Sequence, residues 1–250
     1  MPKYKEIDIN NSHPTRESEF TRQPIYGSFS LILIGFMFVT LLPHYGKVLS
    51  SDQVVTFQFI LHAILYLGWY VLFAVQSRLS LNKNIHLHMT LGYMSIFLFC
   101  GLIFSGAIML IDVMRNYDST WTAEFLRSRT SFVWAISHTL ISFASFYLLG
   151  VVLRKKLHAH KRFMVLASLS MVSASVTRIA FLPMMPIDGT LLTLLSTYVF
   201  LLVPIIIDRV VFGRVHPVLK WGVPLYAVTQ ILFIGLIPST EIGQLMAFPF

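Results

Sequence analysis

Long apolar runs alternate with short polar segments over most of this chain. Seven runs approach the roughly 20 residues that a helix needs to cross the hydrocarbon core of a bilayer. They cover residues 28–44, 54–76, 89–111, 130–153, 163–182, 191–207 and 221–237. Backbone groups in lipid must bond to one another, and a helix does this within a single segment. The pattern therefore predicts an all-α integral membrane bundle of seven transmembrane helices.

The polar segments indicate the domain organisation. Residues 1–27 carry charges of both signs and lack the apolar core of a signal peptide, so we expect a retained cytoplasmic tail. Residues 28–250 are expected to form one transmembrane domain. The longest connecting segment, 112–129, contains Tyr117, Trp121 and Phe125. This composition predicts a short helix at the membrane interface.

The charges of the chain carry information about topology. Of the 19 Lys and Arg residues, 14 lie in the tail or in segments on the same side of the bundle, and short basic loops stay in the cytoplasm. We therefore expect a multi-pass protein of the cell inner (plasma) membrane with a cytoplasmic N-terminus. The charged fraction, 12%, is about half that of a soluble domain. The expected partner is thus the lipid bilayer, and the net charge of +8 implies no nucleic acid.

Histidines occur at two depths of the predicted bundle. His62 and His138 each lie about nine residues into parallel runs, which places both near the outer surface. His88 and His160 precede two further parallel runs, near the inner surface. His86 and His158 lie two residues earlier, roughly 200° around a helix, so only one histidine of each neighbouring pair faces the bundle. We favour the two that lie nearer the apolar runs, His88 and His160.

Two neutral imidazoles from facing helices can hold a b-type haem, one on each side of its ring. The depths predict two haems, one between His62 and His138 and one between His88 and His160, which would carry electrons across the membrane. Arg178 lies inside the fifth run and is a candidate for binding a haem propionate or an anionic substrate. A structural ion pair, or extension of its side chain to the interface, is the alternative.

This arrangement resembles the two-haem b-type transmembrane cytochromes, the ascorbate and ferric reductase family. The resemblance covers residues 54–182 and rests on topology. It implies that helices two to five supply the haem ligands, with His62 opposite His138 and His88 opposite His160. It also implies a membrane oxidoreductase with quinol or another redox partner as electron donor. The substrate-binding motifs of that family are absent from this chain, so ascorbate is not predicted.

Several strings also resemble an uncharacterised family of bacterial multipass membrane proteins. They are HAILYLGW (62–69), HMTLG (88–92), HKRFM (160–164) and GRVHP (213–217). The resemblance implies a bacterial inner-membrane protein and assigns no activity. It draws attention to Gln76, Asp208 and His216, which the haem interpretation does not use.

Two other functions remain open at this point. Histidines and a carboxylate at the inner surface suit zinc in a hydrolase or non-haem iron in a hydroxylase. The residues of this alternative metal site are His86, His88, His158, His160, Asp208 and His216. In the third interpretation the protein is a non-catalytic subunit of a membrane complex, and its basic surface meets anionic lipid head groups.

Overall fold

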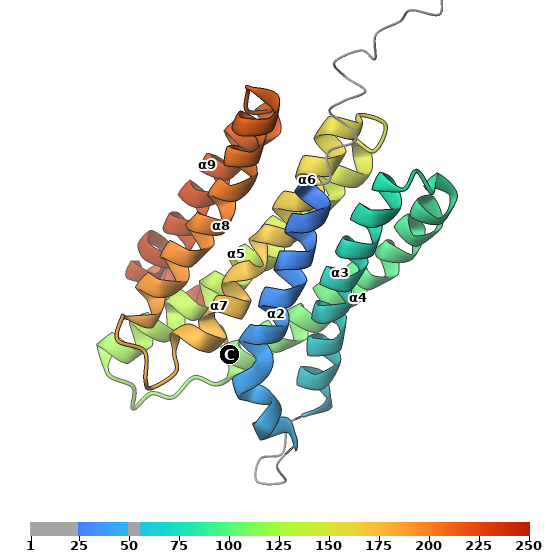
Figure 1. Cartoon of the computed structure of the whole chain (residues 1–250). Helices are drawn as coiled ribbons and strands as arrows, with labels where there is room; N and C mark the ends of the chain where they lie inside the picture. Colours follow the sequence, from blue (N-terminus) through green and yellow to red (C-terminus); the bar gives the residue numbers. More distant parts are fainter. Residues whose placement is uncertain (1–24, 50–55) are drawn as a thin grey trace, which may run out of the picture.

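The computed structural model describes residues 25–49 and 56–250, and the elements in these ranges are helices (Figure 1). They are α2 (Ile25–Leu49), α3 (Phe57–Leu81), α4 (Ile85–Arg115), α5 (Ala123–Val152), α6 (Leu157–Ser170), α7 (Val172–Ala180), α8 (Gly189–Phe212), α9 (Pro217–Ile231), η2 (Leu232–Leu236), η3 (Ile237–Ser239) and α10 (Glu241–Ala247). Residues 1–24 of the predicted tail lie outside the described residues. The first helix starts at Ile25, three residues before the expected boundary.

Within the described ranges, seven helical stretches are long and apolar enough to cross a membrane, so the seven-helix prediction is confirmed. The fifth stretch combines α6 with α7, and the seventh combines α9 with η2 and η3. The cytoplasmic position of the N-terminus stays a prediction.

The helices form antiparallel neighbours along the chain (Figure 1). α4 packs mainly against α3, and α6 packs mainly against α5, while α2 lies along α3 and α7. The turns at 82–84, 153–156 and 213–216 lie at the same end of the bundle, which we call the basic end. Segments 116–122 and 181–188 lie at the opposite end with α10, and we call this the aromatic end.

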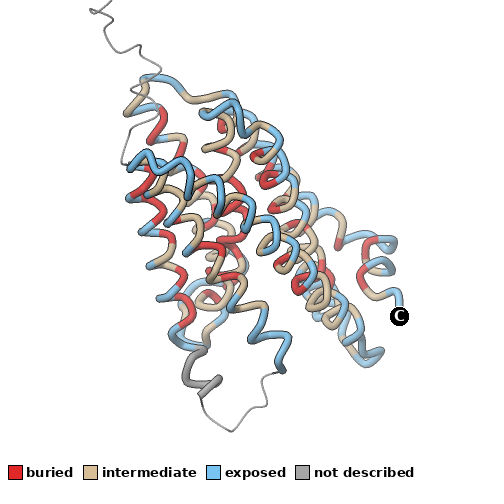
Figure 2. Tube along the Cα trace, turned by 90° about the vertical axis from the view of Figure 1, so that its right-hand side faces the viewer, coloured by how far each residue is buried: buried red, intermediate tan, exposed pale blue. Residues whose placement is uncertain are grey.

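The most deeply buried of the described spans is the pair α6 and α7, at the centre of the bundle (Figure 2). The helix is interrupted at Met171, between Ser170 and Val172. Phenol groups from neighbouring helices donate hydrogen bonds to carbonyls around this interruption. Tyr70 donates to Ser168 at 2.8 Å, Tyr66 to Met171 at 2.8 Å, and Tyr226 to Ser170 at 3.2 Å. Irregular backbone at membrane depth is tolerated because it is buried in protein and bonded in this way.

The segment 112–129 differs from its expected form, because no separate interfacial helix lies in this described stretch. α4 continues to Arg115, and α5 begins at Ala123 behind the N-cap Thr122, whose hydroxyl accepts from the Phe125 N–H at 3.3 Å. Asp118 closes the connection by accepting from the N–H and the hydroxyl of Thr120, and these bonds hold the pKa of Asp118 below its usual value. The aromatic residues thus belong to a short connection and to the start of a transmembrane helix.

Candidate functional site

Two of the predicted ligands, His88 and His160, come together at the basic end. Their ring centroids are 6.5 Å apart and the ring planes are nearly perpendicular, at 87°. Each histidine lies in the first turn of its helix. The side chain of Asn84 caps the start of α4 by accepting from the Leu87 N–H at 3.2 Å, whereas α6 begins at Leu157 without a side-chain cap. The two rings lie close together, although α4 packs mainly against α3 and α6 packs mainly against α5.

One ring nitrogen of His160 is already bonded within the protein. Its Nδ1 lies 2.8 Å from the carbonyl oxygen of Gly150 on α5. A carbonyl only accepts, so Nδ1 carries the proton in this pairing and the lone pair is on Nε2. A Cβ at Gly150 would lie 3.3 Å from the Cβ of Phe163, which shows how closely α5 and α6 approach here. Metal-ligating histidines commonly donate their second ring N–H to a backbone carbonyl in this way.

Gln76 of α3 completes the group. Its Nε2 donates to the backbone carbonyl of His88 at 3.0 Å. Two buried atoms beside this bond, Gln76 Oε1 and His88 Nδ1, have no hydrogen-bond partner among the described residues. Buried polar atoms without partners are rare in proteins and commonly mark a place that accommodates a ligand, an ion or a rearranged hydrogen bond.

The structure places His62 and His138 on separate networks. The Nδ1 atom of His62 lies 2.9 Å from the hydroxyl of Ser105 on α4. The Nε2 atom of His138 lies 3.0 Å from the hydroxyl of Thr229 on α9. Leu140 explains the difference, because its side chain packs beside Gly106 of α4 and residues two positions apart point to different sides of a helix.

The surroundings of His138 are aromatic. Its ring centroid lies 4.8 Å from that of Tyr226 and 5.4 Å from that of Phe233, and Ser142 lies 3.3 Å from its Nε2. This histidine is 2% exposed. Its ring thus fills the interface between α5 and the last span, in contact with residues other than His62.

Arg178 lies in α7, near the residues around His62. Its NH1 donates to the carbonyl of Ala174 at 2.6 Å, one turn earlier. The guanidinium carbon lies 6.0 Å from the ring centroid of Tyr66, and that ring lies 6.3 Å from the ring of His62. Arg178 and His62 therefore contact the same tyrosine, while His88 and His160 form their pair at the basic end.

Asp208, proposed for the alternative metal site, is engaged in a buried ion pair. Arg162 donates from Nε to one carboxylate oxygen at 2.8 Å and from NH2 to the other at 2.6 Å. The hydroxyl of Tyr26 and the backbone N–H of His216 also donate to this carboxylate, at 2.7 and 3.0 Å. Both oxygens are thereby bonded, which leaves the carboxylate poorly suited to bind a metal.

The other candidate ligands of the metal alternative have different surroundings. His86 is exposed, and the backbone carbonyl of His158 accepts from NH1 of Arg162 at 3.0 Å. His216 caps α9 by accepting from the Val218 N–H at 3.2 Å, and burial followed by the charge of Arg162 lowers the pKa of His216. Across residues 25–49 and 56–250, no three or more His, Cys, Asp or Glu side chains are grouped so that they could hold a metal ion.

From the sequence, Arg162 was counted only as one of the 14 basic residues on the cytoplasmic side, and its role was missed. The side chain is 2% exposed and inserted between helices. Asp208 was a usable signal, since beyond the tail it is the one acidic residue in the segments assigned to that side. A carboxylate at the end of an apolar run needs a cation close by.

Comparisons of the chain with protein-family models, with curated proteins and with solved structures find no match.

Proposed function

We propose that this protein is a membrane electron carrier that holds a b-type haem between His88 and His160. The observation that carries the proposal is the separation of 6.5 Å between the two ring centroids. Imidazoles on opposite sides of one metal ion have ring centres about 6 Å apart, because each metal–nitrogen bond is about 2 Å long. The two histidines lie on different helices, as bis-histidine ligation in a helix bundle requires.

The hydrogen bonds around the pair fit this use. In His160 the bond from Nδ1 to the Gly150 carbonyl leaves Nε2 as the ligating atom. For His88, the unpaired Oε1 of Gln76 is the acceptor at hand for the unpaired Nδ1. A hydrogen bond between these two atoms would satisfy both of them and orient the ring. Gln76 is therefore a positioning residue in this proposal.

The bound haem would supply one-electron reduction and oxidation at the basic end. The chain contributes a tightly packed aromatic layer between that end and the level of His62. The rings of Trp69 and Phe143 are 4.8 Å apart, and those of Phe99 and Tyr147 stack at 4.3 Å. Trp69, Phe143 and Tyr147 are buried in this layer.

The second predicted haem has weaker support in the geometry. His62 and His138 would both have to leave their present partners, Ser105 and Thr229, before they could share a ligand. The proposal therefore assigns one haem to each chain.

Haem content tests the proposal. The purified protein should show the Soret and α bands of a bis-histidine b-type haem, with about one haem per chain by extraction. His88→Ala or His160→Ala should remove it. His86→Ala and His158→Ala are matched controls that should retain it, because these neighbours lie outside the pair.

The same measurement identifies the alternatives. A protein without haem, in a preparation whose helical content and thermal transition are intact, overturns the proposal. Two haems per chain, one of them lost in His62→Ala and His138→Ala, would restore the two-haem arrangement. Gln76→Leu should weaken haem retention and shift the reduction potential, whereas a merely structural role would change stability alone.

A further inference from the structure

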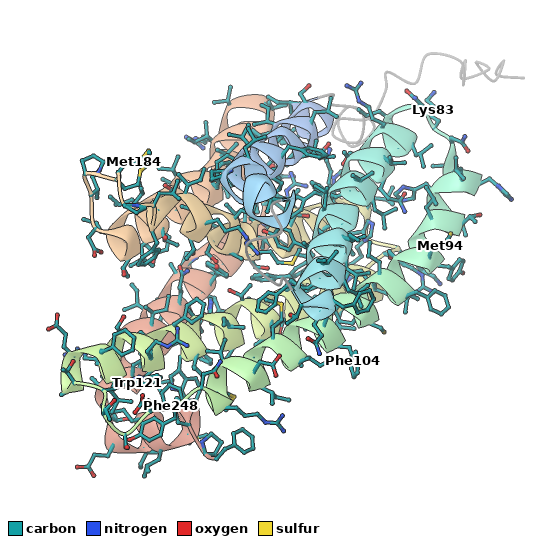
Figure 3. The ribbon with its side chains drawn as sticks, turned by 90° about the horizontal axis from the view of Figure 1, so that it is seen from below. Lys83, Met94, Phe104, Trp121, Met184 and Phe248 are labelled. Carbon is teal, nitrogen blue, oxygen red and sulfur yellow. The ribbon has the colours of Figure 1, made fainter. Side chains whose placement is uncertain are left out.

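At the aromatic end, the C-terminal helix α10 and the connection 116–122 form a cap over the start of α5. Trp121 contacts Tyr117, Phe125 and Phe248, with ring centroids 5.1–5.6 Å apart. Figure 3 shows Trp121 and Phe248 side by side at this end. The indole N–H of Trp134 donates to the carbonyl of Gly243 at 2.9 Å and ties α10 to α5. These contacts hold the cap against the rest of the fold.

The cap contains a hollow of about 410 Å³ that is open to the surface. Most of its lining residues are apolar or aromatic, namely Tyr117, Leu126, Leu245, Phe248 and Phe250, and the other two are Gln244 and the acidic Glu241. Apolar side chains continue outward from it, since Leu245 is 71% exposed and Phe250 is 70% exposed. A hollow of this composition favours an acyl chain or another apolar group.

Two arginines at this end of the bundle lie against aromatic rings. The guanidinium of Arg115 lies 5.4 Å from the ring centroid of Phe250, which lines the hollow. The guanidinium of Arg129 lies 5.7 Å from the rings of both Trp121 and Phe132. The Nε of Arg129 is buried and has no hydrogen-bond partner within the described part of the chain.

When aromatic rings contact the flat face of a guanidinium group, the N–H groups at its edge can still donate to an anion. The arrangement of these N–H groups matches the oxygens of a phosphate group. The cap lies where α4 ends and α5 begins, next to the end of the seventh apolar span, so it is at the level where the phosphates of one leaflet are found. We propose that the cap binds one glycerophospholipid, with its phosphate at Arg115 and Arg129 and an acyl chain across the hollow. This site is independent of the haem proposal, because it lies at the opposite end of the bundle.

Native mass spectrometry of the full chain tests the proposal. The probe is dioleoyl phosphatidylcholine added to delipidated protein, because its zero net charge limits binding to the basic end. We expect one retained lipid per chain. Arg115→Gln and Arg129→Gln should each weaken retention about tenfold, as the loss of one charge-assisted hydrogen bond implies. Arg127→Gln is the matched control, since this exposed arginine of the same helix should leave retention unchanged.

Two further probes separate the phosphate from the acyl chains. Dioleoylglycerol has the same chains without phosphate, and glycerol phosphate has the phosphate without chains. Both should compete poorly with the complete lipid. Equal retention of dioleoylglycerol, equal binding of glycerol phosphate, or unchanged retention in both arginine variants would overturn the proposal, provided that the thermal transitions of the variants match that of the parent.

Discussion

Asp208→Asn tests the energetic role of the buried ion pair at the basic end. Asp208 is fully buried and accepts four hydrogen bonds, two from Arg162, one from Tyr26 and one from the backbone of His216. All of these partners are donors. An asparagine would turn an NH₂ group toward at least one of them and would leave the buried guanidinium without a counter-charge.

The expected loss is about 3–5 kcal/mol of the free energy of unfolding, the cost of removing one partner of a buried ion pair. Tyr26→Phe removes one hydrogen bond to a charged group and should cost less, about 1.5–3 kcal/mol. The double variant Arg162→Met, Asp208→Leu removes both charges together. It should recover much of the stability lost in Asp208→Asn, because no uncompensated charge remains.

Unfolding in SDS, followed by circular dichroism in mixed micelles, gives these free energies. A loss below about 1 kcal/mol for Asp208→Asn would refute the reasoning, since surface ion pairs contribute that little. A double variant that is as unstable as Asp208→Asn would also refute it, because packing would then outweigh charge compensation.

Three further measurements probe other parts of the molecule. Gly243→Ala should destabilise the docking of α10 by about 1–3 kcal/mol, because the added Cβ would collide with the backbone of Ile237. Gly235→Ala is the matched control, since a Cβ there has no atom within contact distance. Proteolysis of the C-terminus measures the difference between the two variants. Burial lowers the folded-state pKa of His216 below its ordinary 6.5. The contribution of His216 to stability is therefore present above that pH and is lost as the pH falls. His216→Asn should keep the helix cap and flatten this part of the pH profile of unfolding. Reporter fusions at Met1 and Phe250 should place the two termini on opposite sides of the membrane, with the N-terminus inside, and equal behaviour would contradict an odd number of spans.

The seven spans were predictable because the length and apolarity of a transmembrane segment are set by the bilayer, a property that each run displays on its own. The depth of each histidine in the membrane was also predictable, because it follows from the number of residues between the histidine and the start of its apolar run. His88 and His160 begin parallel helices, and the structure brings them together. The rotation of each helix about its own axis was harder to predict from the sequence. His138 points to α9 because Leu140 occupies the face toward α4, a choice made by packing between segments distant in the chain.

The interruption at Met171 lay beyond sequence reasoning for a related reason. The run that contains it is continuous in hydropathy, and the tyrosines that bond its carbonyls come from α3 and α9. The role of Arg162 was missed because a basic residue at the end of an apolar run has the same sequence pattern whether it faces the cytoplasm or a buried carboxylate. Only its partner, 46 positions further along the chain, distinguishes the two.

The position of α6 in the bundle connects stability with the proposed function. This helix carries His160, and two residues later it carries Arg162, which is anchored to Asp208 by two hydrogen bonds. His160 therefore lies on the most deeply buried of the described spans. His88 lies on α4, a span with much more lipid-facing surface, and its local restraint is the bond from Gln76. A ligand shared by the two histidines would join the outer helix to the fixed one. Because a ligand that binds only the native state stabilises it, hydrogen exchange of α4 near His88 should slow on haem binding, while α6 should change little.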